Sequence, residues 1–275
     1  MGELTKDYPD IYCVGECWSG DNEVLQYYTA MNCFNFTMSQ AEGMVATAAK
    51  GSSIGTYLNY VESYQDKILE RNPNAMMNAF LANHDTNRIA GAFILDGYMK
   101  MAANLYLLAH GSPVIYYGEE IGMRGSRGSE ATDANRRLAM LWGDNDYIRN
   151  PFGSTYPDSK QIQTTVASQL DDPNSMLSHY AKLINIRTRY PAIARGNYNA
   201  VTSTSKNFGG FYVDYNNEIL GIFHNTATTE LTIDLGRCAG LDGHTFSEIL
   251  EVIGGTATLN GTMLTISGQT SIIVK

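Results

Sequence analysis

The sequence lacks the features that mark several large classes of protein. No run of about eighteen apolar residues occurs, so no transmembrane helix is expected. Lysine and arginine number 19 against 28 aspartates and glutamates, and the net charge of −9 argues against nucleic acid as a partner. There is no nucleotide-binding glycine loop, no Ser-His-Asp order and no metal-ligand cluster. The N-terminal segment shows no signal peptide.

Cysteine is scarce as well. The chain has four cysteines, and none of them has the paired CxxC spacing of a zinc site. Two of them fall within strand-like runs, where buried free thiols are ordinary. We therefore expect four unpaired structural thiols, at Cys13, Cys17, Cys33 and Cys238.

The residues that are present predict a folded α/β protein. The 275 residues are 44% hydrophobic and 17% charged, which is typical of a globular chain with one large or two ordinary domains. Continuous apolar runs, typical of parallel strands covered on both faces, occur at 11–16, 31–36, 76–83 and 112–120. Apolar residues with helical spacing predict helices at about 55–71, 92–110 and 174–190.

From about residue 196 the pattern changes to short alternating runs, which are typical of half-exposed antiparallel strands. Turn signals separate them at Asn216-Asn217, Gly254-Gly255 and Asn260-Gly261. We therefore divide the chain into a β/α unit at 1–193 and an antiparallel β domain at 194–275.

Two carboxylates stand at the ends of predicted parallel strands, Glu16 and Asp85. In β/α barrels the active site forms at the carboxyl ends of the strands. Burial beside Trp18 would weaken the acidity of Glu16 by desolvation, so that it could donate a proton near neutral pH. Asp85 beside His84 could stay ionised and stabilise positive charge on a substrate. Each also has an ordinary interpretation, as a surface carboxylate and as a structural hydrogen-bonded pair.

Three segments in this order carry a resemblance: "VGECWSG", "FLANHDTNR" and "GSPVIYYGEEIGM". Together they resemble the α-amylase family, glycoside hydrolase family 13. The resemblance implies that Glu16 is the general acid/base at the end of the fifth barrel strand. It implies that Asp85 stabilises the transition state at the end of the seventh strand, and that His84 contacts the sugar. The third segment matches the eighth strand, followed by two acids, Glu119 and Glu120.

A fourth segment, "TDANRRLAMLW", resembles a stretch that follows the eighth strand in that family. In related maltodextrin-acting members, its Asp and Arg help to hold the non-reducing end of the substrate, which would be Asp133 and Arg137 here. A solvated loop with a surface ion pair is the alternative. Trp18 and Arg88 are further candidates to line the cleft, whereas Arg136 is expected to be structural.

The family's nucleophile, an Asp in a segment like Asp-Gly-x-Arg-x-Asp-Ala, has no counterpart in this sequence. The resemblance therefore implies strands five to eight of a (β/α)8 barrel followed by a β-sandwich domain, as in a fragment of a larger enzyme. We expect the chain alone to be inactive and the half-barrel to associate with itself. No cofactor is expected in this chain. Calcium is common in the family and could be bound by the intact parent protein. We expect the parent to be secreted or at the cell surface, with a cytoplasmic location as the alternative.

Several functions fit these residues. The first is hydrolysis of α-1,4-glucans such as starch or maltodextrins by a retaining mechanism. A transglycosylase would use the same residues with a sugar as acceptor. A non-catalytic carbohydrate-binding protein could also have kept the fold, and a chance match by an unrelated β/α protein is the remaining alternative.

Overall fold

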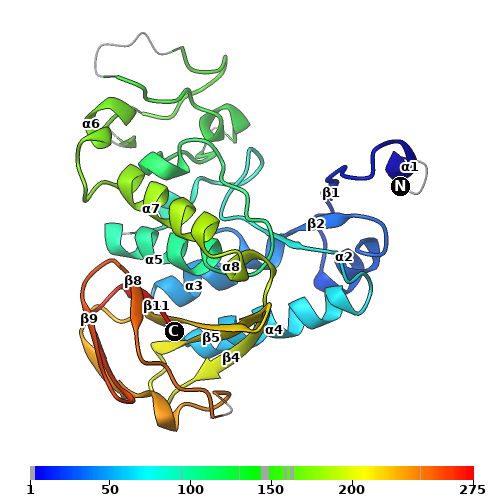
Figure 1. Ribbon diagram of the computed structural model, residues 1–275. Helices are drawn as coiled ribbons and strands as arrows, with labels where there is room; N and C mark the ends of the chain where they lie inside the picture. The colour runs from blue at the N-terminus through cyan, green and yellow to red at the C-terminus, as the bar shows by residue number, and fades with distance from the viewer. Residues whose placement is uncertain are drawn as a thin grey trace.

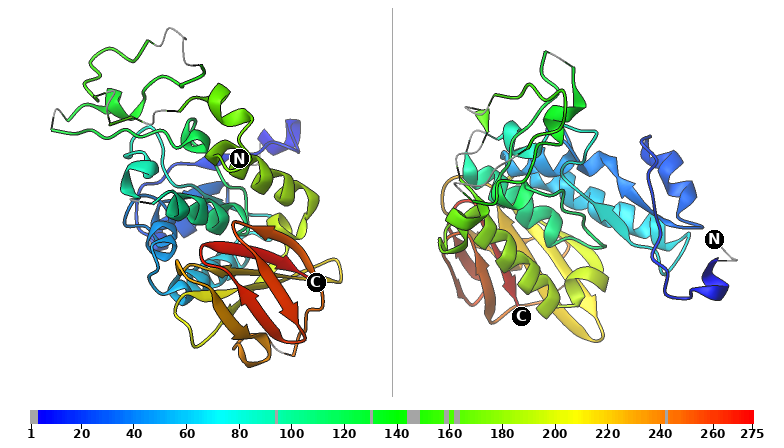
Figure 2. Two further views of the ribbon diagram at one scale, coloured as in Figure 1. Left: turned by 90° about the vertical axis from the view of Figure 1, so that its left-hand side faces the viewer. Right: turned by 90° about the horizontal axis from the view of Figure 1, so that it is seen from above.

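The computed structural model describes residues 4–93, 95–129, 131–143, 149–157, 160–161, 164–241 and 243–275. Figures 1 and 2 show a small parallel sheet, a layer of helices, and antiparallel sheets that pack beneath those helices. The N-terminal segment stands at the outer side of the parallel sheet, away from the antiparallel sheets (Figure 1). Among the described residues, no helix has the length and apolar character needed to cross a membrane.

The parallel sheet has three short strands in the order β1-β2-β3. Its strands are β1 (Val14–Gly15), β2 (Asn32–Asn35) and β3 (Met77–Ala79). Both pairings are parallel, as the apolar runs predict. The prediction of a fourth strand at 112–120 is wrong. Within that segment only Val114 pairs, in a single parallel bridge to Phe80, and a 3-10 helix begins at Glu119. The described strands form an open sheet and do not close into a barrel.

Helices cover the parallel sheet and link it to the antiparallel one. The α-helices are α1 (Leu4–Asp7), α2 (Asp21–Tyr27), α3 (Met44–Ala49), α4 (Ile54–Leu69), α5 (Asp96–Leu107), α6 (Val166–Leu170), α7 (Met176–Arg189) and α8 (Ala192–Arg195). The 3-10 helices are η1 (Phe36–Met38), η2 (Ile89–Ala92), η3 (Glu119–Ile121), η4 (Asp133–Arg136) and η6 (Leu235–Arg237). The three predicted helices are confirmed as α4, α5 and α7, with α5 shorter at its N-terminal end because η2 precedes it.

Helix α4 shows how the sequence builds this layer. Its apolar side chains recur every three or four residues, and those of Leu58, Val61 and Ile68 are buried in the main core. The amide of Gln65 is buried too; it donates to the Gly196 carbonyl and accepts from the Tyr198 N–H, at 3.1 and 3.0 Å. One side chain thus satisfies the main chain where the first antiparallel strand begins.

The antiparallel part consists of two sheets. A five-stranded sheet has the order β4-β5-β6-β11-β8, and a three-stranded sheet has the order β7-β10-β9. Their strands are β4 (Asn197–Thr202), β5 (Phe208–Tyr215), β6 (Glu218–Asn225), β7 (Leu231–Asp234), β8 (Ile249–Ile253), β9 (Ala257–Asn260), β10 (Met263–Ile266) and β11 (Thr270–Val274). A second apolar cluster, including Phe223, Leu264 and Ile272, draws its residues from both sheets. Phe211 and Ile273 instead join the helices in the main core.

A buried polar chain ties the helices to the five-stranded sheet. His179 of α7 donates from Nε2 to the Asn104 amide oxygen at 2.8 Å, and Asn104 of α5 donates to Ser271 Oγ at 2.9 Å. Ser271 of β11 in turn meets His224 Nδ1 of β6 at 2.7 Å. Burial lowers the pKa of His179 to about 4 and that of His224 to about 3, so both rings are neutral at neutral pH.

Candidate active site

The two predicted catalytic carboxylates lie at one edge of the parallel sheet. Glu16 follows β1 directly, and the Asn83–Asp85 segment follows β3 and its one-residue bridge. Because all three strands run in the same direction, their carboxyl ends meet at a single edge. Strand β2 lies between β1 and β3, which leaves one strand position between the two carboxylates.

A row of aromatic rings connects the three strand ends. Trp18, two residues after Glu16, stacks on Phe36 with ring centroids 4.8 Å apart. Phe36 begins the turn after β2 and meets the edge of Phe80 at 5.0 Å. Trp18 is 55% exposed, so one face of its ring is free to stack on a ligand.

The expectation that Glu16 is buried is wrong. Its side chain is exposed, and the neighbouring Ile11 and Tyr12 are 39% and 50% exposed. The physical reason is that β1 is an edge strand, with no strand paired on its outer side in the described part of the chain. In this arrangement the Glu16 side chain is accessible to a substrate.

A local turn presents His84 and Asp85 at the edge of the sheet. The Asn83 side chain accepts from the Asp85 N–H at 3.0 Å, and buried Thr86 accepts from the Asn83 N–H at 2.9 Å, which together fix an Asx-type turn. The side chains of His84 and Asp85 are 53% and 38% exposed and lie 3.3 Å apart, from Nε2 to Oδ2. Both are thus available to hydroxyl groups of a ligand.

Arg137 contacts this pair directly. Its Nη2 donates to Asp85 Oδ1 at 2.8 Å, and its Nε donates to the His84 carbonyl at 3.1 Å. Asp133, the other residue expected to hold the non-reducing end of the substrate, makes different contacts. Asp133 pairs instead with Arg136 at 2.8 Å and with Arg127 at 3.1 Å.

Arg88, which was expected to line the cleft, is one of the residues that line a cavity of about 340 Å³ together with Asn87 and Arg136. It is only 3% exposed, and its guanidinium lies over the rings of Tyr116 and Tyr117, with Cζ 4.6 and 4.5 Å from their centroids. It donates to the carbonyls of Tyr117 and Arg136, at 2.6 and 3.0 Å. Arg88 therefore supports the site from beneath, where aromatic faces and carbonyls compensate the burial of its charge.

Glu119 is a further carboxyl group with a perturbed environment. Glu119 is buried in η3, and its Oε1 accepts from the hydroxyls of Tyr106 and Tyr180 at 2.6 and 2.8 Å. Burial raises the pKa of Glu119 to about 7. Sequence motifs mark this residue only as part of the eighth-strand segment. Its contacts show a structural anchor between α5 and α7.

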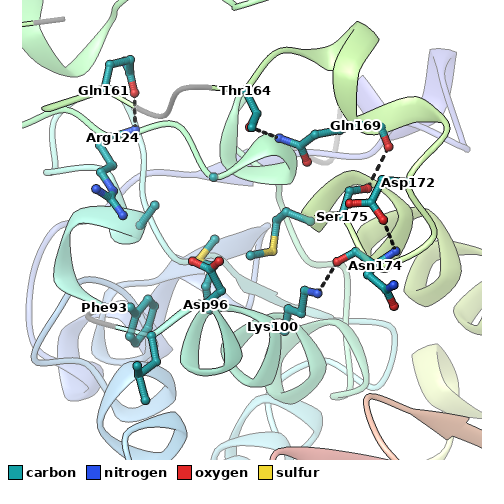
Figure 3. A pocket seen from close by; sticks show the side chains of 15 residues that line it. Phe93, Asp96, Lys100, Arg124, Gln161, Thr164, Gln169, Asp172, Asn174 and Ser175 are labelled. Carbon is teal, nitrogen blue, oxygen red and sulfur yellow. Dashed lines mark hydrogen bonds between the residues drawn. The ribbon is translucent and has the colours of Figure 1, made fainter. Parts of the chain in front are cut away.

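A cavity of about 440 Å³ is lined by other residues (Figure 3). It lies between the start of α5 and the 164–176 segment, and Asp96, Lys100 and Arg124 are among its lining residues. Glu16, His84 and Asp85 are not among the described residues that line it. Within the described ranges, no three His, Cys, Asp or Glu side chains are grouped so that they could hold a metal ion. The four cysteines are free, as predicted.

Comparison with known proteins gives the same family as the sequence motifs. The model of the α-amylase catalytic domain matches residues 1–196. The chain is 28% identical over 246 residues to Alpha-amylase 3 of Dictyoglomus thermophilum, covering 83% of this chain and 45% of that protein. It is 31% identical over 238 residues to Alpha-amylase SusG of Bacteroides thetaiotaomicron, covering 82% of this chain and 33% of that protein.

Solved structures agree over nearly the whole chain. Eubacterium rectale Amy13B superposes with a TM-score of 0.87 and 26% identity, covering 99% of this chain and 54% of that one. The α-amylase from H. orenii gives a TM-score of 0.80 and 25% identity, covering 99% and 55%. The chain thus spans about half the length, or less, of these relatives. It belongs to the α-amylase family of glycoside hydrolases, family 13.

Proposed function

We propose that this chain supplies the acid/base and the transition-state stabiliser of an enzyme that hydrolyses α-1,4-glucans such as starch or maltodextrins. The observation that carries the proposal is the placement of Glu16 and Asp85, both accessible, at the same edge of one parallel sheet. The names of the two curated relatives, both α-amylases, support the choice of substrate.

Each residue has a role in a retaining mechanism. Glu16 donates a proton to the glycosidic oxygen and then, as a base, activates the water that releases the sugar. Asp85 stabilises the positive charge that develops on the sugar ring, and His84 donates to its hydroxyl groups. Trp18 offers an apolar face to a neighbouring sugar, and the Arg137 guanidinium donates a hydrogen bond to the Asp85 carboxylate.

The catalytic nucleophile has to come from outside residues 1–275. A retaining enzyme needs a second carboxylate about 5–5.5 Å from the acid. The sequence holds no Asp-Gly-x-Arg-x-Asp-Ala segment, and the chain spans 54% of the Eubacterium rectale structure. We place the nucleophile in the part of the relatives that this chain does not match.

This proposal predicts that activity depends on the complementary half. A fusion is built in which residues 1–275 replace the matched part of the Eubacterium rectale relative. We expect release of reducing sugar from soluble starch by the fusion and none by the 275-residue chain, because only the fusion holds both carboxylates. Starch hydrolysis by the chain alone, surviving Glu16→Gln, would contradict the assignment. Maltooligosaccharides longer than the substrate among the products would identify a transglycosylase instead.

A second prediction concerns β1, the outermost strand of the parallel sheet. Tyr8, Ile11 and Tyr12 are 63%, 39% and 50% exposed beside a strand with no partner on its outer side in the described part of the chain. Exposed edges with apolar side chains promote strand pairing, so we propose that the isolated chain associates with itself. Light scattering at about 100 µM should give a mass at least twice that of the chain.

Ile11→Lys should restore the monomer, because a charged side chain on an edge opposes pairing. Phe152→Lys serves as the matched control, since Phe152 is fully exposed elsewhere and its change should leave the mass unaltered. A monodisperse monomer for the unaltered chain at this concentration would refute self-association.

A further inference from the structure

The segment Asp133–Arg137 places two adjacent arginines beside the His84–Asp85 turn. We propose that Arg136, which the sequence motif leaves unassigned, is a positioning residue that holds Arg137 against the Asp85 carboxylate. The importance of that carboxylate rests on the proposed function. The placement of Arg137 itself is a structural claim that can be tested without a substrate.

The side chain of Arg136 joins the two segments of the site. Its Nη1 donates to the Asp85 carbonyl at 2.7 Å and to Asp133 Oδ1 at 2.8 Å. Its Nε donates to Asn87 Oδ1 at 3.0 Å. With only 14% of this side chain exposed, these bonds are shielded from water far more than an ordinary surface pair. One guanidinium therefore links η4 to the main chain of Asp85 and to Asn87, which follows the turn.

The main chain of Arg136 is held as firmly as its side chain. Its carbonyl accepts from Arg88 Nε at 3.0 Å and from the Tyr116 hydroxyl at 3.3 Å. Arg88 is itself buried against the rings of Tyr116 and Tyr117, so this carbonyl is anchored to the core. The backbone from which the Arg137 side chain starts is consequently fixed.

Arg137 needs such a support. Its side chain is 43% exposed, and an exposed arginine–carboxylate pair by itself contributes little, because water screens it and the long side chain loses rotamer freedom. Its two bonds, to Asp85 Oδ1 and the His84 carbonyl, require the correct starting position of residue 137. The Arg136 side chain adds to the hold on its own carbonyl by tying this backbone to the Asp85 carbonyl and to Asn87, next to the two acceptors of Arg137.

Arg127 provides the matched control. It also pairs with Asp133, at 3.1 Å, and its guanidinium further contacts the Ala131 carbonyl. Only its main-chain N–H reaches Asn87, so Arg127→Gln removes a similar cation and keeps that contact. If the charge on Asp133 alone mattered, the Arg127 and Arg136 variants would behave alike.

The test follows the Nε–H proton of Arg137 by NMR in the 275-residue chain, with Arg137→Gln used to assign its signal. This proton donates to the His84 carbonyl, so its exchange with water reports the position of the side chain. We expect Arg136→Gln to speed its exchange at least ten-fold, and Arg127→Gln to change it less than two-fold. Equal exchange in the parent and in Arg136→Gln would overturn the proposal.

Asn87→Ala covers the case in which Arg136→Gln does not fold. Asn87 is exposed and accepts from Arg136 Nε and from the Arg127 N–H, so its removal takes one acceptor from Arg136 while the Arg136 guanidinium keeps its bonds to Asp85 and Asp133. We expect about three-fold faster exchange of the Arg137 proton, and no change would again count against the proposal. In the active fusion, Arg136→Gln should lower kcat/KM about ten-fold. A fusion that hydrolyses no glucan would refute the proposed function while leaving the exchange result decisive for Arg136.

Discussion

Glu16→Gln in the fusion enzyme is expected to lower kcat for starch by about 10²–10⁴-fold, the range typical of a lost general acid/base. The glutamine keeps the size of the side chain and removes its proton. Hydrolysis of a maltosyl fluoride, whose leaving group needs no protonation, should lose much less in the first step of the reaction. The ratio of the two losses, from initial rates on both substrates, distinguishes an acid from a residue that only maintains the fold.

Glu23→Gln is the matched control for this change. Glu23 lies on α2, just after the same strand, and accepts from the Ser19 hydroxyl at the surface. We expect its amide variant to keep kcat within two-fold of the parent enzyme. Equal losses from the Glu16 and Glu23 variants, or equal losses on starch and on the fluoride, would remove Glu16 from the acid/base role.

The second large effect is loss of stability in mild acid. Burial lowers the pKa of His110 and His179 to about 4 and that of His224 to about 3, against an ordinary value of 6.5. Below pH 6.5 the unfolded chain binds protons at these rings that the folded chain does not, so stability falls as the pH decreases toward 4. Each ring contributes up to about 1.4 kcal/mol per pH unit.

Glu119 acts in the opposite direction. Its folded-state pKa of about 7 lies above the ordinary 4.5, so the stability that it contributes is lost as the pH rises from 4.5 to 7. Between pH 6 and 5 the change in the free energy of unfolding due to Glu119 therefore cancels about that of one of the three histidines. The net expectation is a loss of roughly 2–3 kcal/mol per pH unit in the free energy of unfolding.

Urea denaturation of the chain at pH 7.5, 6.0 and 5.0 measures this slope. His179→Gln should make it shallower by about 1 kcal/mol per pH unit, because one titrating ring is removed. Phe152→Gln is the control, since Phe152 is fully exposed and neither side chain titrates, so the change should leave the slope unchanged. A free energy of unfolding that stays constant or rises from pH 7.5 to 5.0 would contradict the expectation that the three buried rings stay neutral in the folded protein.

The sequence predicted those parts of the fold and site that depend on local patterns. Continuous apolar runs predicted parallel strands, helical spacing predicted α4, α5 and α7, and two short motifs placed Glu16 and Asp85 at strand ends. The Asx-type turn at Asn83 lies within the motif itself, so its geometry follows from adjacent residues.

What the sequence did not predict depends on contacts between distant segments. Arg88 and Arg136 are 48 residues apart in the sequence, and only the fold shows that one donates to the carbonyl of the other. The burial of Glu119 depends on hydroxyls from α5 and α7, which no local pattern joins. Glu16 was expected to be buried because a neighbouring Trp suggests a pocket, whereas an edge strand leaves that side open.

The most direct test of the account is a crystal structure of the Glu16→Gln fusion with maltotetraose. The account predicts one sugar chain at the carboxyl edge of the parallel sheet, with the residue 16 amide within hydrogen-bond distance of a glycosidic oxygen. Asp85 and His84 should contact hydroxyls of the adjacent sugar ring. A sugar bound elsewhere, or one that reaches residue 16 but leaves Asp85 without a contact, would contradict the central claim.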